Sequence, residues 1–399
     1  EGRIPIYEPG LDRLVADNVR EGRLAFTTDL TEAVRGTEAV FLAVGTPSRR
    51  GDGHADLTYV FAAAEQVARA AAGPIVLVTK STVPVGTGRR VREVVRAARP
   101  DLAIEVASNP EFLREGSAIG DFMRPDRVVI GVEAGEGGER ALAVLRRLYR
   151  PLYLIETPIV ATSIETAELI KYAANAFLAV KITFINEIAD VCEKVGADVH
   201  DVARGMGLDG RIGRKFLHAG PGYGGSCFPK DTLALARTAQ DAGSSVRLVE
   251  TTIEVNEARK AQMAERVIAA CGGSVEGRTV AVLGLTFKPE TDDLRESPAL
   301  VVVPHLVGAG ARVRAFDPAG MVHARALLPA SVHYAANALD AAEGADALVL
   351  LTEWNEFRAL SPERLARAMR GRVLLDLRNV YDPAAMRAAG FHYSAIGRA

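Results

Sequence analysis

The sequence predicts an α/β protein in which two halves with parallel sheets flank a helical middle. Short apolar runs rich in Val and Ile alternate with Ala- and Arg-rich helical stretches. Residues 163–195 form one helical stretch without proline or glycine, and the alternating pattern returns at residue 277. Alternation of this kind is typical of parallel sheets that are covered by helices.

The first half contains four predicted strands. Residues 39–47 and 74–84 are apolar runs that end in Gly, Ser, Thr and Pro turns, and residues 58–72 are the helix between them. Strands at 101–112 and 126–132 complete this half. Because open parallel sheets bind ligands beyond the carboxyl ends of their strands, the loops that follow these strands are candidate binding segments.

The middle and the second half follow the long helix. A further helical stretch is predicted at 231–271, then strands at 277–287 and 312–318 around a helix at 297–310, whose Ser-Pro start suits a helix N-terminus. The segments "GTEAVFLAVGT" and "GADALVLLTEW" share a Gly-x-x-Ala entry into an apolar strand. This short echo favours two similar α/β halves.

Composition excludes several classes of protein. A chain of 399 residues with 48% hydrophobic content indicates about two or three globular domains. Its 48 basic and 50 acidic residues are mixed and sum to a net charge of -2, so a nucleic-acid partner is not expected. No apolar run reaches transmembrane length and no leader opens the chain, so no membrane partner is expected either.

Cysteine and histidine usage argues against disulfides and metal. Cys192, Cys227 and Cys271 are odd in number and form no CxxC pair, which favours a reducing compartment, and we expect a cytoplasmic protein. No metal site is expected, because no i, i+4 pair or His-x-His spacing occurs among the histidines His54, His200, His218, His305, His323, His333 and His392.

One cysteine lies in the turn "GPGYGGSCFPKD", residues 220–231. A lone cysteine is usually a small core residue, but glycines at 222, 224 and 225 suggest that a ligand approaches the backbone near Cys227. Lys230 and Asp231 follow closely, and a nearby cation favours the thiolate, the form that attacks a carbonyl. The turn therefore predicts a nucleophilic thiol.

The long helix carries a polar stripe. Glu168, Lys171, Asn175 and Asn186 follow one another at spacings of three, four and eleven residues, so they share one face of the helix. Such a stripe can be a solvated face. Two asparagines, which are poor helix formers, favour a functional site instead.

Six segments in order resemble the UDP-glucose/GDP-mannose dehydrogenase family, on its UDP-glucose branch. They are "STVPVGT", "SNPEFLREG", "DFMRPDRVVIG", "IKYAANAF", "GYGGSCFPKD" and "FKPETDDLRESP". The resemblance runs from "GRIPIYEPGL" to "DLRNVYDP". It implies two Rossmann-like parallel-sheet domains joined by a long central helix and a helical dimerisation region. The implied domains are an NAD-binding domain at 1–160, a central catalytic domain at 161–262 and a UDP-sugar-binding domain at 263–399.

The resemblance implies an enzyme that oxidises the C6 alcohol of UDP-glucose to the carboxylate of UDP-glucuronate with two NAD and one water. In this chemistry a thiolate forms a thiohemiacetal with the aldehyde, and loss of hydride leaves a thioester for water to cleave. Cys227 is the implied nucleophile. Lys171 and Asn175 are implied to stabilise the oxyanion, Asp231 to activate water, and Thr82 and Glu111 to lie at the reacting centre.

The resemblance also implies the binding residues and a homodimer or larger homo-oligomer, with Arg211 reaching the neighbouring subunit's site. Either Arg378 or Arg372 is implied to contact the nucleotide. The implied substrate-binding residues are Glu111, Phe112, Leu113, Lys171, Asn175, Arg211, Phe216, Leu217, His218, Ala219, Gly220, Tyr223, Gly224 and Lys288. The implied cofactor-binding residues are Val44, Gly45, Thr46, Ser81, Thr82, Glu115, Cys227, Lys230 and Arg295.

A glycine fingerprint for the dinucleotide is missing from this sequence. In "GVEAGEGGER" Arg140 stands at the third glycine, and in "GYGGSC" Cys227 does, so both are decoys. The resemblance implies that the fingerprint lies upstream of "GRIPIYEPGL", in a βαβ unit of ~30 residues or more. The chain that begins at Glu1 is then expected to bind UDP-glucose, to bind NAD weakly and to aggregate through exposed strand edges.

Other functions compete with this interpretation. The substrate could be GDP-mannose or a UDP-N-acetylhexosamine, although Phe228 after the cysteine favours the UDP-glucose branch. The chain could be an inactive nucleotide-sugar-binding fragment, which the presence of all four implied catalytic residues disfavours. A cysteine hydrolase would need a histidine partner, and His218 is the nearby candidate.

Overall fold

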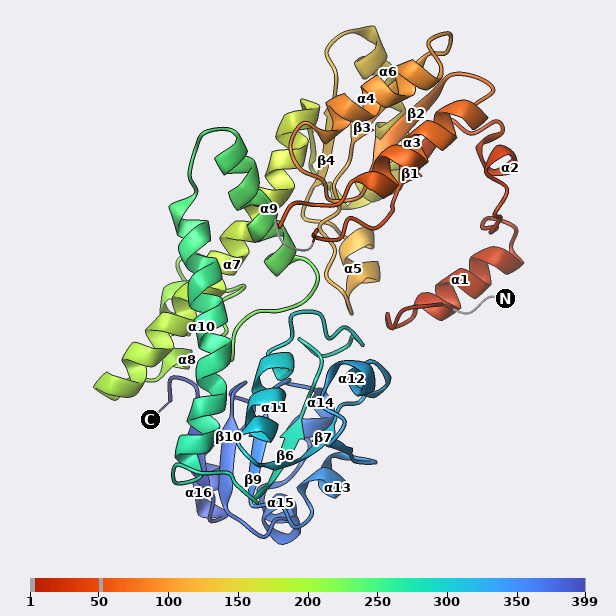
Figure 1. Cartoon of the computed structure of the whole chain (residues 1–399). Coiled ribbons are helices and arrows are strands. Elements are labelled where there is room, and N and C mark those ends of the chain that lie inside the picture. Colours follow the sequence, from red (N-terminus) through yellow and green to blue (C-terminus); the bar gives the residue numbers. More distant parts are fainter. Residues whose placement is uncertain (1–3, 50–52, 399) are drawn as a thin grey trace. The chain divides into compact units, whose positions relative to one another are not determined.

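The structure, a computed structural model, describes residues 4–49 and 53–398. The chain divides into two compact units, and each unit is built from two separate segments of the sequence. The first consists of Glu1–Asn175 and Lys230–Val246, and the second of Ala176–Pro229 and Arg247–Ala399. Each unit contains one sheet with helices packed on it (Figure 1), which confirms the predicted α/β class.

The sheet of the first unit has five strands in the order β1-β2-β3-β4-β5. Neighbours are parallel except β3 and β4, which are antiparallel and pair Ala107 with Val132. The predicted parallel sheet therefore contains one antiparallel step. Two consecutive strands can be parallel only if the connection between them crosses over the sheet, usually as a packed helix. The connection between β3 and β4 contains the six-residue helix α5 (Ala118–Met123), which buries no residue and so does not form such a crossover. The strands are β1 (Ala39–Leu42), β2 (Ile75–Thr79), β3 (Ile104–Ser108), β4 (Val128–Val132) and β5 (Ile159–Thr162).

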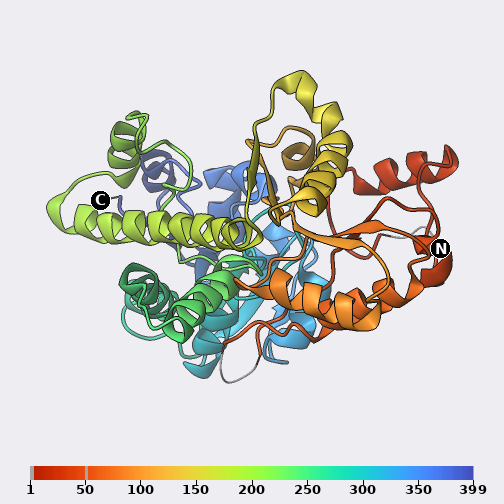
Figure 2. The same ribbon diagram turned by 90° about the horizontal axis from the view of Figure 1, so that it is seen from above.

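Helices cover both faces of this sheet because its strands are apolar on both sides. In β2, Ile75 and Leu77 join one core cluster, and Val76 and Val78 join another. The first cluster includes α2 (Leu30–Val34), α3 (Thr58–Ala70) and α4 (Thr87–Ala98), and the second includes α6 (Glu136–Leu148). Figure 2 shows the orange helices α3 and α4 together on one side of the strands. The unit also contains α1 (Leu11–Arg20) and the 3₁₀ helix η1 (Arg150–Ile155).

The sheet of the second unit has six parallel strands in the order β11-β10-β9-β6-β7-β8. The chain leaves β6 toward β7 and β8 on one side and later adds β9, β10 and β11 on the other. This is the doubly wound order, whose ligand crevice lies at the carboxyl ends of the strands beside the reversal. The strands are β6 (Thr279–Leu283), β7 (Arg312–Phe316), β8 (His333–Tyr334), β9 (Ala347–Leu350), β10 (Val373–Asp376) and β11 (His392–Ala395).

Two core clusters sandwich the second sheet. One contains residues of α10 (Arg247–Ala270) and α11 (Ala299–Gly308) with the side chains of one sheet face. The other contains residues of α13 (Ala338–Ala342), α15 (Pro362–Ala368) and α16 (Pro383–Ala388). The second unit also contains α8 (Val199–Gly207), α12 (Met321–Leu327) and α14 (Asn355–Arg358).

The helical middle differs in part from the prediction. Helix α7 (Ile164–Val195) confirms the long helix, and the Ser163 hydroxyl accepts a hydrogen bond from Thr166 N at 3.2 Å. The single stretch predicted at 231–271 is instead two helices, α9 (Phe228–Asp241) and α10. Between them Gly243 adopts a φ of 71°, which ends the first helix. The predicted start of α11 is confirmed, because Ser297 Oγ accepts from Ala299 N at 3.2 Å.

Candidate active site

The loops after β1 and β2 are joined by side-chain hydrogen bonds. Ser81 Oγ donates to Val44 O at 2.7 Å, and Thr46 Oγ1 donates to Thr82 O at 3.0 Å. All four residues were predicted to bind the cofactor. They lie at the carboxyl ends of adjacent parallel strands, where an open α/β sheet binds its ligand.

A buried lysine and a glutamate form the charged centre of the first unit. Lys171 Nζ lies 3.1 Å from Glu111 Oε1, and the Lys171 side chain is 3% exposed. Leu113 N donates to the second oxygen of Glu111 at 2.5 Å. The ammonium also lies 5.3 Å from the centroid of the Phe112 ring. The segment after β3 therefore delivers its carboxylate to the cation on α7.

A second polar group in the same unit connects α7 and α9. Asn175 Nδ2 donates to Asp231 Oδ2 at 2.6 Å, and Lys230 Nζ donates to Asp231 Oδ1 at 2.7 Å. Asp231 is 1% exposed. Both oxygens have a donor, so a carboxylate in this buried position is stabilised.

The polar stripe on α7 is buried along its length. Glu168, Lys171, Asn175 and Asn186 are all buried, so the solvated-face alternative is wrong. The role of Glu168, however, is structural, because its two carboxylate oxygens accept from Gly86 N and Gly88 N, each at 2.7 Å. These are free amides at the start of α4, and a carboxylate satisfies them well. Burial raises the pKa of Glu168 to about 7, although the two backbone bonds oppose the shift.

Glu168 should make the stability of the protein depend on pH. Its pKa is raised from 4.5 in the unfolded state to about 7 in the folded state, so the folded state binds more protons between these values and stability falls as pH rises through this window. Glu168→Gln should lack this fall. Urea unfolding at pH 5 and pH 8 measures it, and an unchanged pH dependence in the variant would contradict the assignment.

The cysteine turn belongs to the second unit and is held there by side chains of α7 and α10. Asn186 Oδ1 accepts from Gly220 N at 2.8 Å. Asn256 pairs with the backbone of Tyr223 in both directions, at 2.8 and 3.1 Å. Arg259 Nε donates to Gly220 O at 2.7 Å. Cys227 follows this segment, directly precedes α9 and is partly exposed.

Packing alone accounts for the glycines of the turn, and the prediction that they let a ligand approach the backbone stays a prediction. A Cβ on Gly224 would lie 2.3 Å from Glu296 O, and one on Gly225 would lie 2.7 Å from the Phe287 ring. Gly222 has a φ of 114°, which side chains rarely adopt. The space that the missing side chains leave is already filled by neighbouring residues.

The structure separates the two candidate nucleotide arginines. Arg378 follows β10, donates to Leu351 O at 2.8 Å and to Phe287 O at 2.9 Å, and so lies at the carboxyl ends of the central strands. Arg372 precedes β10 and donates to Met369 O at 3.1 Å, at the opposite end of that strand. Only Arg378 lies at the crevice where doubly wound sheets bind ligands.

The other predicted binding residues lie in varied surroundings. Arg211 pairs with Asp209 at 2.6 Å and its side chain is 90% exposed, and Arg295 pairs with Asp293 at 2.8 Å. Phe216 adopts a φ of 66°, a strained conformation for a bulky residue. Lys288 Nζ lies 5.1 Å from the centroid of the Phe287 ring. Leu217, Ala219, Gly220, Tyr223 and Gly224 are buried, His218 is exposed, and Glu115 and Gly45 follow β3 and β1.

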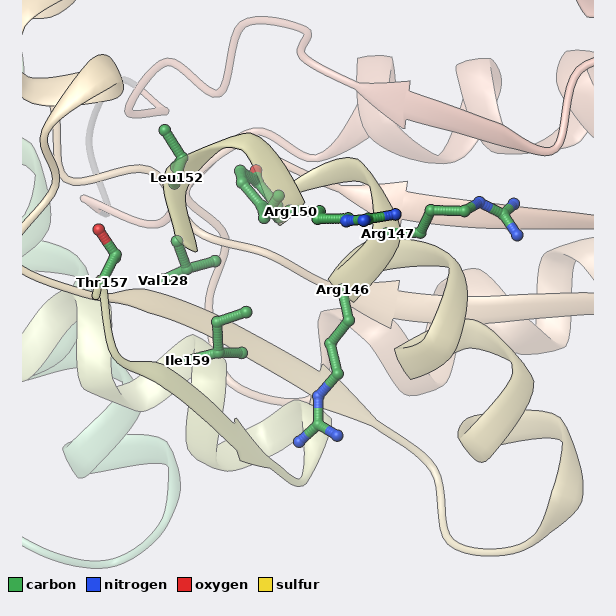
Figure 3. Close-up of a pocket in the computed structure, with 8 residues that line it drawn as sticks. Val128, Arg146, Arg147, Arg150, Leu152, Thr157 and Ile159 are labelled. Carbon is green, nitrogen blue, oxygen red and sulfur yellow. The ribbon is translucent and has the colours of Figure 1, made fainter. Parts of the chain in front are cut away.

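A hollow of about 430 Å³ lies elsewhere in the first unit (Figure 3). Its apolar surface is formed by Val128, Leu152 and Ile159, and the guanidinium groups of Arg146 and Arg147 point away from these side chains. None of the predicted catalytic residues lines it. The predicted catalytic residues therefore lie outside this hollow.

Neither a metal cluster nor a membrane-spanning helix occurs in the described ranges. Within residues 4–49 and 53–398, no three His, Cys, Asp or Glu side chains gather in a way that could hold a metal ion. Over the same residues, no helix is both long and apolar enough to cross a membrane.

Comparison with known protein families defines the class of protein: three domains of one nucleotide-sugar dehydrogenase family match this chain. The NAD binding domain of the UDP-glucose/GDP-mannose dehydrogenase family matches residues 1–153. The central domain of that family matches residues 165–258, and its UDP binding domain matches residues 281–383. The expected cofactor, NAD, is thereby confirmed.

Individual relatives agree with this class. The UDP-glucose 6-dehydrogenase of Rhizobium meliloti (strain 1021) is 62% identical over 398 residues, which cover 100% of this chain and 90% of the relative. A structure of a UDP-glucose dehydrogenase from Pyrobaculum islandicum is 41% identical, with a TM-score of 0.90, over 100% of this chain and 88% of that one. A UDP-D-ManNAc dehydrogenase from Pyrococcus horikoshii is 27% identical, with a TM-score of 0.85, over 100% and 90%. This chain belongs to the UDP-glucose/GDP-mannose dehydrogenase family.

Proposed function

We propose that this chain catalyses the NAD-dependent four-electron oxidation of UDP-glucose to UDP-glucuronate. The observation that carries the proposal is the 62% identity, over the whole chain, to a relative named UDP-glucose 6-dehydrogenase. Identity to the UDP-glucose dehydrogenase structure, 41%, also exceeds the 27% to the UDP-D-ManNAc dehydrogenase. This difference favours glucose over an N-acetylhexosamine as the sugar.

When bound, NAD would supply the acceptor for the hydride that leaves the substrate carbon in each of the two oxidations. The hydrogen-bonded loops after β1 and β2 fit a dinucleotide, because they present the exposed Gly45 and small hydroxyl side chains at the ends of parallel strands. We assign cofactor binding to Val44, Gly45, Thr46, Ser81, Thr82, Glu115, Cys227, Lys230 and Arg295.

The first oxidation converts the C6 alcohol to an aldehyde by loss of a proton and a hydride. Lys171 and Asn175 stabilise negative charge as it develops on the C6 oxygen. Glu111 holds the Lys171 ammonium at 3.1 Å, and Thr82 contacts the reacting centre. The support for these roles is that Lys171 and Asn175 are buried donors, each with a carboxylate partner.

The second oxidation needs a tetrahedral adduct. The Cys227 thiolate attacks the aldehyde carbon to form a thiohemiacetal, and loss of the second hydride leaves a thioester. Asp231 activates water, which cleaves the thioester, releases the carboxylate and restores the thiol. Each oxygen of Asp231 accepts one hydrogen bond from the protein and keeps lone-pair capacity for a water proton.

We assign the nucleotide sugar to the segment after β3 and the turn before α9. The residues are Glu111, Phe112, Leu113, Lys171, Asn175, Arg211, Phe216, Leu217, His218, Ala219, Gly220, Tyr223, Gly224 and Lys288. Arg378 is the better nucleotide candidate of the two arginines, since it lies at the carboxyl ends of β9 and β10. The match of the UDP binding domain to residues 281–383, which include Arg378, supports this choice of arginine.

We further propose the assembly, the location and the domain division implied by the family. The exposed side chain of Arg211 is available to a second subunit in a homodimer or larger homo-oligomer. Three free cysteines favour the cytoplasm. The division at 1–160, 161–262 and 263–399 is supported by family regions at 1–153, 165–258 and 281–383.

A panel of nucleotide sugars tests the proposal. With NAD present, UDP-glucose should give NADH with a kcat/KM at least about 10² above those of GDP-mannose and a UDP-N-acetylhexosamine, because a site built for one sugar leaves polar groups unpaired with another. Absorbance of NADH measures this. A higher kcat/KM for either competitor would contradict the proposed substrate, and binding of UDP-glucose without NADH would indicate a binding protein.

A further inference from the structure

Lys80, at the carboxyl end of β2, has no role in the function described above. Its Nζ donates to Asn109 Oδ1 and to the Tyr149 hydroxyl, each at 3.1 Å. The ammonium also lies 5.6 Å from the centroid of the Tyr149 ring and 6.0 Å from that of Phe122. None of the ion pairs found among the described residues involves Lys80. Neutral acceptors and two rings therefore hold this cation.

Asn109 is the reason that Lys80 bears on the candidate site. It is buried, its Nδ2 donates to Val129 O at 2.7 Å, and its Oδ1 accepts from both Lys80 and Tyr149. Only two residues further on, Glu111 pairs with Lys171. The backbone turn that presents Glu111 is thus fixed at Asn109 by the lysine on the neighbouring strand.

The charges around Lys80 form a cluster of two cations and one carboxylate. Lys80 is attracted by Glu111 and repelled by Lys171, and burial, the largest influence, lowers the pKa of Lys80 to about 8. The carboxylate already has Lys171 as its close partner. When both lysines are protonated, the cluster carries a net positive charge, which favours negative charge on a nearby oxygen.

We propose that Lys80 is a positioning residue for the oxidation, which fixes the Asn109–Glu111 turn against Lys171 and adds a second positive charge that favours the developing oxyanion. This inference rests on the proposed function. Lys80 acts through Asn109 and through its field at Lys171, and it does not contact the reacting atoms.

The proposal predicts that kcat falls at alkaline pH, which gives the pH profile of kcat an alkaline limb. Lys80 should lose its proton as pH rises through about 8, so kcat should fall there. The titratable and charged groups that face it are Glu111, Lys171 and Tyr149, and the pKa of Tyr149 is raised to about 12, chiefly by burial. Tyr149 therefore stays neutral through this range.

Three variants of Lys80 and its partner test the proposal in the purified protein. Lys80→Met keeps the stem without the charge, and should lower kcat about tenfold with KM within about threefold and no remaining alkaline limb near pH 8. Lys80→Arg keeps its charge far above pH 8 and should move the limb to higher pH. Tyr149→Phe removes one acceptor of the ammonium and should move the limb to lower pH. Lys194→Met, at an exposed lysine, is the matched control and should match wild type.

Two outcomes would overturn the proposal. One is a kcat for Lys80→Met within twofold of wild type, and the other is the same alkaline limb in all three variants. If the variants were poorly active for want of folding, their thermal unfolding would show it, and Tyr149→Phe, which keeps the ring, would carry the test alone.

A stability measurement separates this inference from the proposed function. Because the pKa of Lys80 is lowered in the folded state, the unfolded state binds more protons between about pH 8 and the ordinary lysine pKa, and stability rises with pH in that window. The difference in unfolding free energy between wild type and Lys80→Met should therefore increase from pH 8 to pH 10. This holds even if wild type fails to oxidise UDP-glucose, which would count against the function alone. A constant difference would overturn the inference.

Discussion

Cys227→Ser should abolish net formation of UDP-glucuronate, by about 10³ or more in rate, while UDP-glucose still binds. A serine hydroxyl is scarcely ionised at neutral pH, so the tetrahedral adduct that the second hydride loss needs does not form. Isothermal calorimetry should give a UDP-glucose affinity within a few-fold of wild type, because the turn before Cys227 is held by Asn186, Asn256 and Arg259 and not by the thiol.

The other two cysteines supply matched controls for this variant. Cys192 and Cys271 are buried in the core of the second unit, and Cys192→Ala and Cys271→Ala should keep their turnover at a temperature where both are folded. Full four-electron turnover by Cys227→Ser would contradict the covalent mechanism. Equal loss in all three variants would point to a general effect of losing cysteine.

Lys171→Ala should lower kcat by about 10² or more and change KM far less, because the ammonium is proposed to act on charge that exists only in the transition state. The variant also leaves Glu111 without its partner at 3.1 Å. Asn175→Ala should change the same parameter in the same direction. Steady-state kinetics with UDP-glucose varied at saturating NAD separates kcat from KM.

The control for this prediction is Lys194→Ala, at an exposed lysine near the end of the same helix. It should leave both constants unchanged. A rise in KM for Lys171→Ala with an unchanged kcat would reassign Lys171 to uniform binding of the substrate.

Much of the fold follows from local patterns in the sequence. The predicted strands were found because their residues are apolar on both faces, as in β2, where all five residues are buried. Strands β5, β8, β10 and β11 were not predicted from the sequence. The long helix was found because nothing between Ser163 and Val195 breaks it. The direction of β4 was not found, because strand direction depends on where the connecting segment packs, and the connection through α5 gives no periodic signal.

The residues of the candidate site likewise fall into those that local patterns predicted and those that they did not. Lys171 and Asn175 were found because their spacing places them on one face of a helix. Asn256, Arg259 and Lys80 were missed, since each acts through contacts with residues at least 29 positions away in the sequence. A polar residue within an otherwise ordinary helix or strand end gives no local sign of a distant backbone partner. Glu168 was found for the wrong reason, because its helix position does not reveal that its carboxylate receives two amides of α4.

The stoichiometry of the complete reaction tests the central claim most directly. Limiting UDP-glucose is incubated with excess NAD and the purified protein, NADH is measured by absorbance, and the sugar nucleotide is identified by mass spectrometry. Two NADH should form for each UDP-glucose consumed, with UDP-glucuronate as the product and no accumulated aldehyde, because Cys227 carries the intermediate through the second oxidation. One NADH for each sugar, with a free aldehyde as the final product, would contradict the account.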